Sequence, residues 1–352
     1  MDIFLLVTHL LSSLTNPPLS HTPRFSVQTA ATIAEELYGI QATVSQLPSE
    51  RDQNFLLTGE SNEKFVLRIA NGLEDPALLA AQNEVLQYLS TRVPFCQRPI
   101  ASLQGQYLDE VTSTDGQTNL VRLNTYLPGV PLGEIPTRSA GLLNDFGLKL
   151  GLLDKVLLDF EHPAVHRKFH WDLAHWKTVV KNYCGLVHDT QLRTAISRYE
   201  VEFERDEAPL LPKLRCSCIH GDPNDYNILI DPDSHAVVGL LDFGDIVYSY
   251  TVGDLAIALA YVVLNDDVPL TTAIHVVAGY KEALPLEDNE IEVLWGLMLM
   301  RLCMSVCLAA YQQQQQPGNE YLDISQRAIR EHLPELLAID RQEASSRFKD
   351  TV

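Results

Sequence analysis

Three polar side chains in one stretch of the sequence, residues 218–245, have the types and the spacing that phosphoryl transfer requires. Asp222 and Asn227 are five positions apart in a polar segment, and Asp242 follows at the end of a second apolar strand. Phosphoryl transfer needs one carboxylate to orient and deprotonate the attacking hydroxyl, and an Asn and an Asp to hold the Mg²⁺ that bridges the phosphates. A hairpin of two short strands would bring the three side chains together, with Asp222 as base and Asn227 and Asp242 as metal ligands.

The polar residues of this stretch also have an ordinary structural explanation. Asp-Pro and Asn-Asp pairs are common in turns, so a polar hairpin between two core strands is the alternative interpretation. The order His-x-Asp-x-x-x-x-Asn followed by Asp-Phe-Gly, however, is the catalytic signature of protein kinases. Gly221 stands where protein kinases have Arg, and no Ala-Pro-Glu segment follows. The ordered combination favours a kinase, although one without the peptide-docking segment of a protein-serine kinase.

This variant of the signature resembles the aminoglycoside-phosphotransferase-like kinases, a family with a kinase fold that acts mostly on small molecules. The resemblance implies an α+β, bilobal, protein-kinase-like fold, in which a small N-lobe has an antiparallel sheet and one main helix. The C-lobe would be larger and mostly helical. We expect an N-terminal extension over residues 1–24, the N-lobe over 25–127, and the C-lobe with the catalytic and metal-binding loops over 128–352.

Several further stretches are similar to one branch of that family, the hydroxylysine kinases. They are Ser49–Phe55, Phe65–Asn71, Leu120–Gly129, His220–Ile230, Leu241–Asp245 and Leu308–Tyr311. In that branch GTP is the donor and 5-hydroxylysine the acceptor. The resemblance therefore implies transfer of the γ-phosphate of GTP or ATP to the hydroxyl of a small amine or amino acid. Homoserine, choline-like alcohols and aminoglycosides are alternative acceptors, and a nucleotide-binding pseudokinase without turnover is the alternative of a different class.

A cation on the third strand of the N-lobe is the expected contact for the nucleotide phosphates. Residues 63–71 alternate as a strand, and Arg68 occupies the position of the kinase Lys. Arg can bind phosphate, but as a planar fork instead of a compact ammonium group. A solvated surface arginine is the alternative. The helix expected over residues 76–89 offers Gln82 and Glu84 as partners of this cation, and spacing alone does not choose between them.

The loop over residues 47–55 takes the place of the glycine-rich loop that covers the nucleotide in kinases. It contains no glycine, so its contacts with phosphate would come from Ser49, Gln53 and Asn54, through their side chains and backbone.

The second nucleotide segment is a buried strand that runs into Pro128-Gly129, a sequence that suits a hinge between the lobes. Its backbone between Leu123 and Leu127, with Tyr126 included, is the expected contact for the edge of a purine.

Helix caps outline the rest of the fold. Ser26, Asp75 and Ser139 each precede an amphipathic segment and are expected to cap helices that begin at residues 27, 76 and 140. Asp254 opens an apolar helix to Leu264, and we expect its carboxylate to bind the backbone of the catalytic loop.

Four residues are candidates for the acceptor site. Asp225 and Asp245 lie beside the catalytic motifs and could receive a substrate ammonium group. Trp171 belongs to an aromatic segment, residues 169–176, that is either a wall of the substrate pocket or the packed start of a helix. Arg301 lies in an apolar run, where a lone cation needs a partner. We expect Arg301 either to pair with Asp254 as a structural brace, or to pair with Asp245 or face the cleft and bind a substrate carboxylate; snorkelling to solvent is the alternative.

Composition narrows the class of partner. The formal net charge is −20, which argues against nucleic acid or an anionic membrane, because both need basic patches. Substrates that carry amines would suit such a surface. The apolar run over residues 293–311 is long enough to span a bilayer, but Arg301 near its middle favours a buried helix of a soluble protein.

The cysteines and the N-terminus indicate a cytoplasmic protein. Six cysteines show no disulfide framework, and Cys216, Cys218 and His220 lack the second pair of ligands that a zinc site needs. The apolar stretch at residues 1–14 has no positive charge ahead of it, so we expect an accessory helix or arm instead of a secretory signal. Between Gln312 and Gln316 a low-complexity patch predicts a loop. The sequence leaves the oligomeric state unknown.

Overall fold

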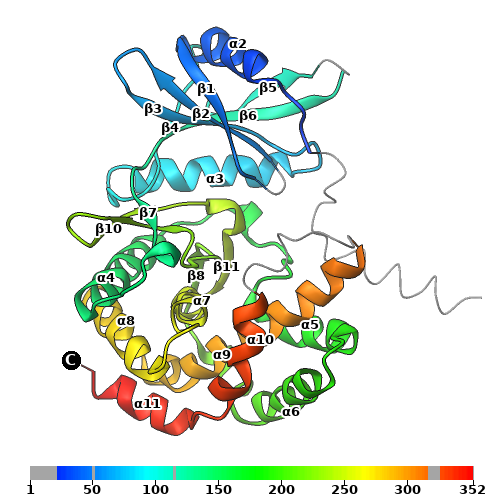
Figure 1. The fold of residues 1–352 in the computed structure, drawn as a ribbon, viewed down its shortest axis with the longest axis vertical. Helices are drawn as coiled ribbons and strands as arrows, with labels where there is room; N and C mark the ends of the chain where they lie inside the picture. The colour runs from blue at the N-terminus through cyan, green and yellow to red at the C-terminus, as the bar shows by residue number, and fades with distance from the viewer. Residues whose placement is uncertain (1–21, 50–51, 114–115, 316–325, 352) are drawn as a thin grey trace, which may run out of the picture. The chain divides into compact units, whose positions relative to one another are not determined.

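The structure is a computed structural model that describes residues 22–49, 52–113, 116–315 and 326–351. It divides into two compact units (Figure 1). The N-terminal unit runs to Pro128 and also includes His162–Val165 and Gly239–Leu241, and the C-terminal unit contains the rest. The expectation for residues 1–21 of the N-terminal extension lies outside the described residues.

The N-terminal unit is built on one antiparallel sheet. Its strands are β1 (Ala42–Leu47), β2 (Gln53–Gly59), β3 (Lys64–Ile69), β4 (Pro99–Ile100), β5 (Asp109–Thr112) and β6 (Thr118–Thr125). The order is β1-β2-β3-β6-β4, with β5 also paired to β6. Side chains of β2 alternate between buried and half-buried, because successive residues of a strand point to opposite faces. The buried face, with Phe55, Leu67 and Val121 among its members, packs against helix α2.

Two capped helices complete this unit, α2 (Val27–Tyr38) and α3 (Pro76–Leu89). The hydroxyl of Ser26 accepts a hydrogen bond from the amide of Thr29 at 3.0 Å. Asp75 caps α3 in the same way through the amide of Ala77 at 2.9 Å. These caps satisfy amides that have no partner within the helix, and both predicted starts are confirmed.

The C-terminal unit is mostly helical. Its helices are α4 (Ala140–Leu157), α5 (Trp176–Tyr183), α6 (Thr190–Asp206), α7 (Val252–Val262), α8 (Pro269–Ala283), α9 (Asp288–Gln315), α10 (Gln326–Leu337) and α11 (Arg341–Lys349). Short strands β7 (Val130–Pro131), β9 (Ile228–Asp231) and β10 (Ala236–Leu240) form one sheet, and β8 (Cys216–Ile219) pairs with β11 (Val247–Tyr250). The predicted kinase-like fold, with an antiparallel N-lobe and a helical C-lobe, is confirmed.

Helix α9 is the centre of this unit, and α5, α7, α10 and α11 pack against it (Figure 1). Among the helices of the described residues, α9 alone is long and apolar enough to cross a membrane. Its most apolar part is entirely buried inside the protein. Cys303 and Cys307 lie in that core. The helix continues to Gln315, so the loop predicted from Gln312 is wrong over its described part. Glutamine is a good helix former, and it extends the long apolar helix by one more turn.

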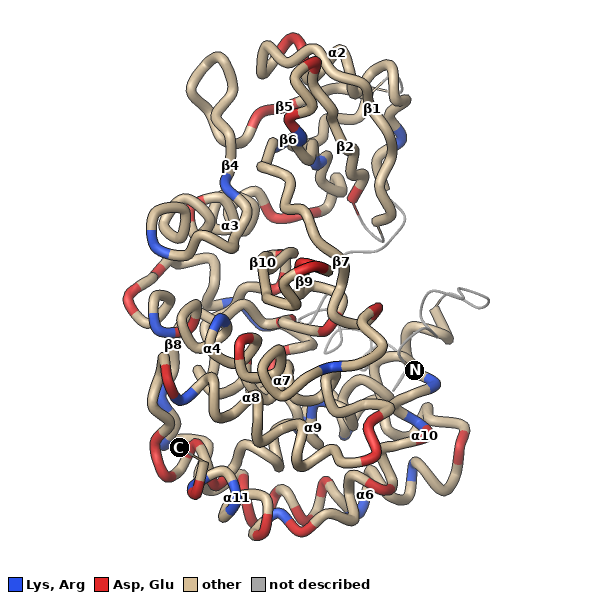
Figure 2. The backbone as a smooth tube through the Cα atoms, turned by 60° about the vertical axis from the view of Figure 1, so that its left-hand side comes forward, with Lys and Arg blue, Asp and Glu red and all other residues tan. Residues whose placement is uncertain are grey.

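Charged residues are spread over both units. Asp and Glu side chains occur along most elements, and the fewer Lys and Arg residues are scattered among them without gathering on one element (Figure 2).

Candidate active site

The predicted catalytic loop follows β8 and is held by helix α7. Asp254 accepts hydrogen bonds from the amides of His220 at 2.7 Å and Gly221 at 2.8 Å, which confirms its predicted role. Gly221 has a φ of +84°, and a Cβ there would lie 2.4 Å from the carbonyl oxygen of Asp245. Only glycine fits a left-handed backbone in such close contact. This contact therefore requires glycine at position 221, where protein kinases have Arg.

Asp222 and Asn227 come together as predicted. The Oδ2 of Asp222 accepts hydrogen bonds from Nδ2 of Asn224 at 2.8 Å and from Nδ2 of Asn227 at 3.2 Å. Nδ2 of Asn227 also donates to the backbone oxygen of Asp222 at 2.8 Å. Because the amide nitrogen of Asn227 is used in this way, its Oδ1 is the atom that can face a cation. These hydrogen bonds fix the orientation of both side chains, the predicted base and the predicted metal ligand.

Asp242 follows β10 in an uncommon backbone conformation, with φ 61° and ψ 74°. Its Oδ1 accepts a hydrogen bond from the amide of Gly244 at 3.2 Å, and the residue is exposed. Non-glycine residues in this region are often found at functional sites. An exposed carboxylate and an amide oxygen are hard donors of the kind that Mg²⁺ prefers. The residues present therefore fit the predicted metal.

The charged residues around Asp222 have opposite effects on the pKa of its carboxyl group. Burial raises the pKa of its carboxyl to about 7, with Asp245 and Asp242 adding to the rise, while Arg301 and Asn224 lower the pKa. These couplings place Asp222, Asp242 and Asp245 in one electrostatic neighbourhood within the C-terminal unit. A carboxyl whose pKa lies near neutrality is well matched to general-base catalysis.

Arg301 is paired with the predicted base itself. Its Nη2 lies 3.3 Å from Oδ1 of Asp222, and its Nη1 donates to the backbone oxygen of Trp171 at 2.5 Å. The guanidinium also lies 4.8 Å from the centre of the Trp171 ring. Arg301 is 2% exposed, so the expected pairing with Asp254 and the snorkelling alternative are both wrong. A lone cation in an apolar helix predicts a partner, but the sequence does not indicate that this partner is Asp222.

The aromatic segment is both structural and close to the site. Trp176 is buried against Phe203, with ring centres 4.8 Å apart, and Asp172 caps the short helical turn that precedes α5. Trp171 is only half-buried and lies beside Arg301. The structural interpretation of the segment is confirmed for Trp176, whereas a role of Trp171 in the substrate pocket stays a prediction.

The two candidate receptors of an ammonium group differ. Asp225 pairs with Arg138 at 3.4 Å, so a cation from the protein itself already occupies it. This contact weakens the assignment of Asp225 to the substrate. Asp245 is half-buried, and its charge acts on both Asp222 and Arg301. We retain Asp245 as the candidate receptor.

In the N-terminal unit Arg68 lies on β3, as predicted. Its Nη2 is 3.8 Å from a carboxylate oxygen of Asp52, and 15% of its side chain is exposed. Glu84 of α3 lies 3.8 Å from His162, and Gln82 is buried. The carboxylate beside Arg68 thus comes from the segment that leads into β2, not from α3.

The nucleotide-covering loop is shorter than predicted. Gln53 and Asn54 belong to β2, and Gln53 is buried with its side chain bonded to the backbone of Phe25 at 2.7 and 2.9 Å. Gln53 is therefore a structural tie to the start of α2 and not a free donor. Ser49 is exposed in the loop. Strand β2 begins early because its alternating buried side chains start at Gln53.

The purine-binding segment also needs correction. Leu123 lies inside the sheet between β3 and β4, and its side chain is fully buried. The amide of Tyr126 donates to the backbone oxygen of Lys64 at 3.2 Å. The carbonyl of Tyr126 and the amide of Leu127 are the backbone groups of this segment that such a contact could use.

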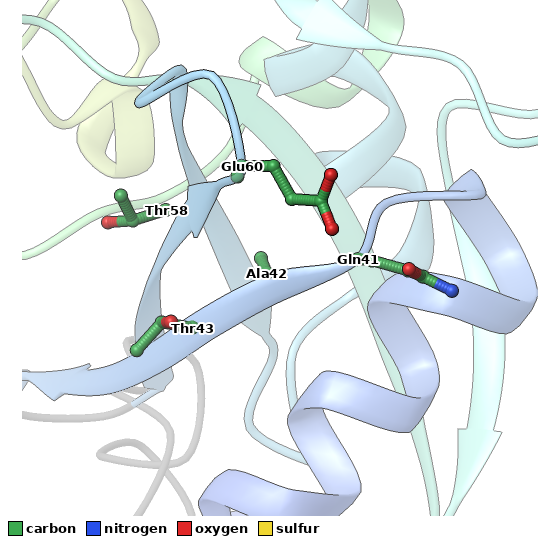
Figure 3. Close-up of a pocket in the computed structure, with 6 residues that line it drawn as sticks. Gln41, Ala42, Thr43, Thr58 and Glu60 are labelled. Carbon is green, nitrogen blue, oxygen red and sulfur yellow. The ribbon is translucent and has the colours of Figure 1, made fainter.

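A hollow in the N-terminal unit is unrelated to these residues. It lies at the edge of β1 and β2 (Figure 3) and is lined by Gln41, Ala42, Thr43, Thr58, Gly59 and Glu60. None of the predicted site residues lines it. Within the described ranges, no group of three His, Cys, Asp or Glu side chains is arranged to hold a metal ion, and the magnesium set proposed above depends on an Asn.

Comparison with known proteins agrees with this geometry. Residues 43–287 match the model of the phosphotransferase enzyme family, and the chain belongs to that family. It is 33% identical over 340 residues to hydroxylysine kinase of Danio rerio, an alignment that covers 93% of this chain and 95% of the relative. The chain is thus an enzyme that transfers phosphate to a hydroxyl group of a small substrate.

Two solved structures share the fold. Amicoumacin kinase hAmiN, in complex with AMP-PNP, Ca²⁺ and Ami, has a TM-score of 0.69 at 16% identity, over 91% of this chain and 97% of its own. A microcompartment-associated aminopropanol kinase has a TM-score of 0.66 at 17% identity, over 93% of this chain and 100% of its own.

Proposed function

We propose that the protein transfers the γ-phosphate of GTP or ATP to the hydroxyl of a small amine or amino acid, with 5-hydroxylysine favoured and Mg²⁺ required. The observation that carries the proposal is the environment of Asp222. One of its oxygens is held by Asn224 and Asn227, and the other faces the buried Arg301. The similarity of the chain to hydroxylysine kinase of Danio rerio supports this choice of acceptor.

Asp222 is the proposed base. Its ionised carboxylate orients the acceptor hydroxyl and takes the proton as the hydroxyl oxygen bonds to the γ-phosphorus. The bond from that phosphorus to the bridging oxygen breaks, and the nucleoside diphosphate leaves. Arg301 favours the charged form of Asp222 before the proton arrives.

Asn227 and Asp242 would hold the metal. A bound Mg²⁺ supplies positive charge that neutralises the phosphate oxygens. Because Nδ2 of Asn227 donates its hydrogen bonds to Asp222, Oδ1 of Asn227 remains available to bind the metal.

Arg68, Ser49 and Asn54 are the proposed side-chain contacts of the nucleotide, and the backbone of residues 126–127 is the proposed contact of the base. Arg68 would pair with phosphate as a bidentate fork. The carboxylate of Asp52 lies 3.8 Å from Nη2 of Arg68.

The acceptor is proposed to be an amino alcohol. In 5-hydroxylysine the carbon that carries the hydroxyl is next to the carbon that carries the terminal ammonium group, so both groups would reach the same site. Asp245, close to Asp222 in charge interaction, is the proposed receptor of that ammonium group, and Trp171 would line it. We do not include Arg301 among the residues that contact the acceptor, because its guanidinium is buried and already binds Asp222 and the Trp171 carbonyl.

The test is a panel of acceptors with purified full-length protein, each with GTP and with ATP, followed by release of nucleoside diphosphate. We expect turnover with 5-hydroxylysine and none above background with lysine, which differs only by the hydroxyl. A higher kcat/KM with homoserine, choline or an aminoglycoside than with 5-hydroxylysine would show that the proposed acceptor is wrong. Loss of activity in EDTA and recovery with Mg²⁺ would support the metal.

We also propose a cytoplasmic location. All six cysteines are free thiols in the structure, and one of them, Cys216, is exposed. Exposed thiols are typical of a reducing compartment.

A further inference from the structure

A second carboxyl group lies behind the catalytic loop. Asp254, the third residue of α7, and Asp154 on α4 are both 0% exposed, and their carboxyl groups are in hydrogen-bonding contact with each other. Oδ2 of Asp154 accepts a hydrogen bond from the hydroxyl of Tyr280, on α8, at 2.6 Å. The chain of contacts therefore runs from α8 through α4 to α7 and on to the amides of the catalytic loop.

Close packing of α4 on α8 makes this contact possible. A Cβ at Gly147 of α4 would lie 1.9 Å from the carbonyl oxygen of Val276, and one at Gly279 of α8 would lie 1.9 Å from the carbonyl oxygen of Asn144. The two backbones thus touch where neither glycine carries a side chain. Tyr280 follows Gly279 directly, so its hydroxyl reaches Asp154 within the core.

Two buried carboxylates in contact cannot both be ionised without a large cost. Arg215 acts on Asp154 and His220 acts on Asp254. Arg215 is already paired with Glu290 at 2.9 Å, and Nδ1 of His220 accepts a hydrogen bond from the amide of Asp222 at 3.2 Å, so that ring nitrogen carries no proton to offset the second charge. One proton must therefore be shared by the two carboxyl groups.

The donors decide which group holds the proton. Both oxygens of Asp254 accept backbone N–H groups, at 2.7 and 2.8 Å, and such bonds stabilise the charged form. Asp154 accepts only the neutral hydroxyl of Tyr280, and its Oδ1 is buried without a donor. A proton on that Oδ1, directed at Asp254, satisfies both groups. Burial and the charge of Asp254 raise the pKa of Asp154 well above its usual range, in agreement with this assignment.

We propose that Asp154 is a neutral carboxylic acid that donates its hydrogen bond to Asp254 and thereby acts as a positioning residue for the catalytic loop. Asp254 then presents a fixed carboxylate to the amides of His220 and Gly221, the two residues that precede Asp222. Misplacement of a catalytic group by about 1 Å costs on the order of 10²-fold in rate. This consequence for rate rests on the proposed function, whereas the protonation state does not.

Infrared spectroscopy of the full-length protein at mildly alkaline pH tests the protonation directly, because Asp222 and Glu207, with pKa values raised to about 7, are ionised there. The wild type should show the carbonyl stretch of a buried protonated carboxyl group, and Asp154→Asn should remove it. Asp159→Asn, which changes an exposed carboxylate just beyond the same helix, is the matched control and should leave the band unchanged. A wild type whose band is absent, or survives in Asp154→Asn, overturns the proposal, whatever the enzyme's substrate.

Hydrogen exchange and kinetics test the positioning role. Asn at position 154 can still donate to Asp254, whereas Leu cannot. Asp154→Asn should therefore retain amide protection over residues 218–227 and keep kcat within about threefold, while Asp154→Leu should lose protection there and lower kcat by about 10²-fold. Equal protection and equal kcat in the two variants would refute the role. If Asp154→Leu does not fold, the infrared comparison of the wild type and Asp154→Asn still decides.

Discussion

The ion pair between Arg301 and Asp222 makes the stability cost of removing the base unusually high. At the observed 3.3 Å, two unit charges attract by about 5 kcal/mol at an effective dielectric constant of 20. Asp222→Asn removes the negative charge and leaves a guanidinium that is 2% exposed without its counter-ion. We expect a loss near the lower end of the about 3–5 kcal/mol that is typical when one partner of a buried pair is removed, because the burial that raises the pKa of Asp222 to about 7 already opposes its charge.

Removing the other partner, in Arg301→Met, should cost less stability. Asp222 has 25% of its side chain exposed and keeps its hydrogen bonds from Asn224 and Asn227, so water can solvate the charge that Arg301→Met leaves behind. The main loss is the hydrogen bond to the Trp171 carbonyl, about 1–3 kcal/mol. The double variant has no buried unpaired charge and should be more stable than Asp222→Asn alone.

Urea denaturation of the four proteins, combined with turnover at saturating substrates, measures both effects. Turnover should fall by about 10²–10⁴ in Asp222→Asn and in the double variant, because both lack the base. The pair Arg327 and Glu331, 3.0 Å apart and 85% and 54% exposed, is the control, with an expected coupling below about 1 kcal/mol. Additive losses at positions 222 and 301, or an Asp222→Asn variant more stable than Arg301→Met, would refute the reasoning.

Three further predictions follow from single contacts. Asp242→Ala should abolish the dependence of nucleotide affinity on Mg²⁺, measured by calorimetry with and without EDTA, and an unchanged dependence would remove Asp242 from the metal site. Gly221→Ala should destabilise the protein and lower kcat, since its Cβ would collide with the carbonyl of Asp245; an unaffected melting temperature and kcat would argue against the strained loop. Burial lowers the pKa of His170 to about 4, so the unfolded chain binds its proton first as the pH falls from about 6.5. His170 should therefore contribute a decline of up to about 3 kcal/mol between pH 6.5 and 4, measured in urea titrations as a loss of wild-type stability relative to His170→Gln; a difference between the two proteins that does not change with pH would contradict this.

The sequence determined much of the fold because its signals were local. Ser26 and Asp75 mark helix starts through side-chain bonds to amides two or three residues away, and such bonds depend on spacing alone. The glycine-free loop was less predictable, since the place where β2 begins depends on the tie between Gln53 and Phe25, 28 residues apart. The glutamine run of α9 continued a helix whose stability comes from its buried neighbours, which composition does not reveal.

The contact between Asp222 and Asn227 was predictable because phosphoryl transfer constrains the order and spacing of the residues that it uses; their catalytic roles stay a prediction. The partner of Arg301 was not predictable from the sequence, because residues 79 positions apart in the chain meet only through tertiary packing. The same holds for Asp154, which on its helix resembles an ordinary polar residue. Its significance appears only when α4 and α7 are seen to share a buried contact.

The central claim is that Asp222 directs phosphate to the hydroxyl of an amino alcohol. Phosphorus NMR of a reaction with 5-hydroxylysine tests it most directly, because a phosphate ester on the hydroxyl-bearing carbon couples to the proton of that carbon. We predict this ester as the product of the wild type and of Arg301→Met, and its absence from a folded Asp222→Asn protein. Inorganic phosphate as the sole product of the wild type, or an equal yield of ester from Asp222→Asn, would contradict the account.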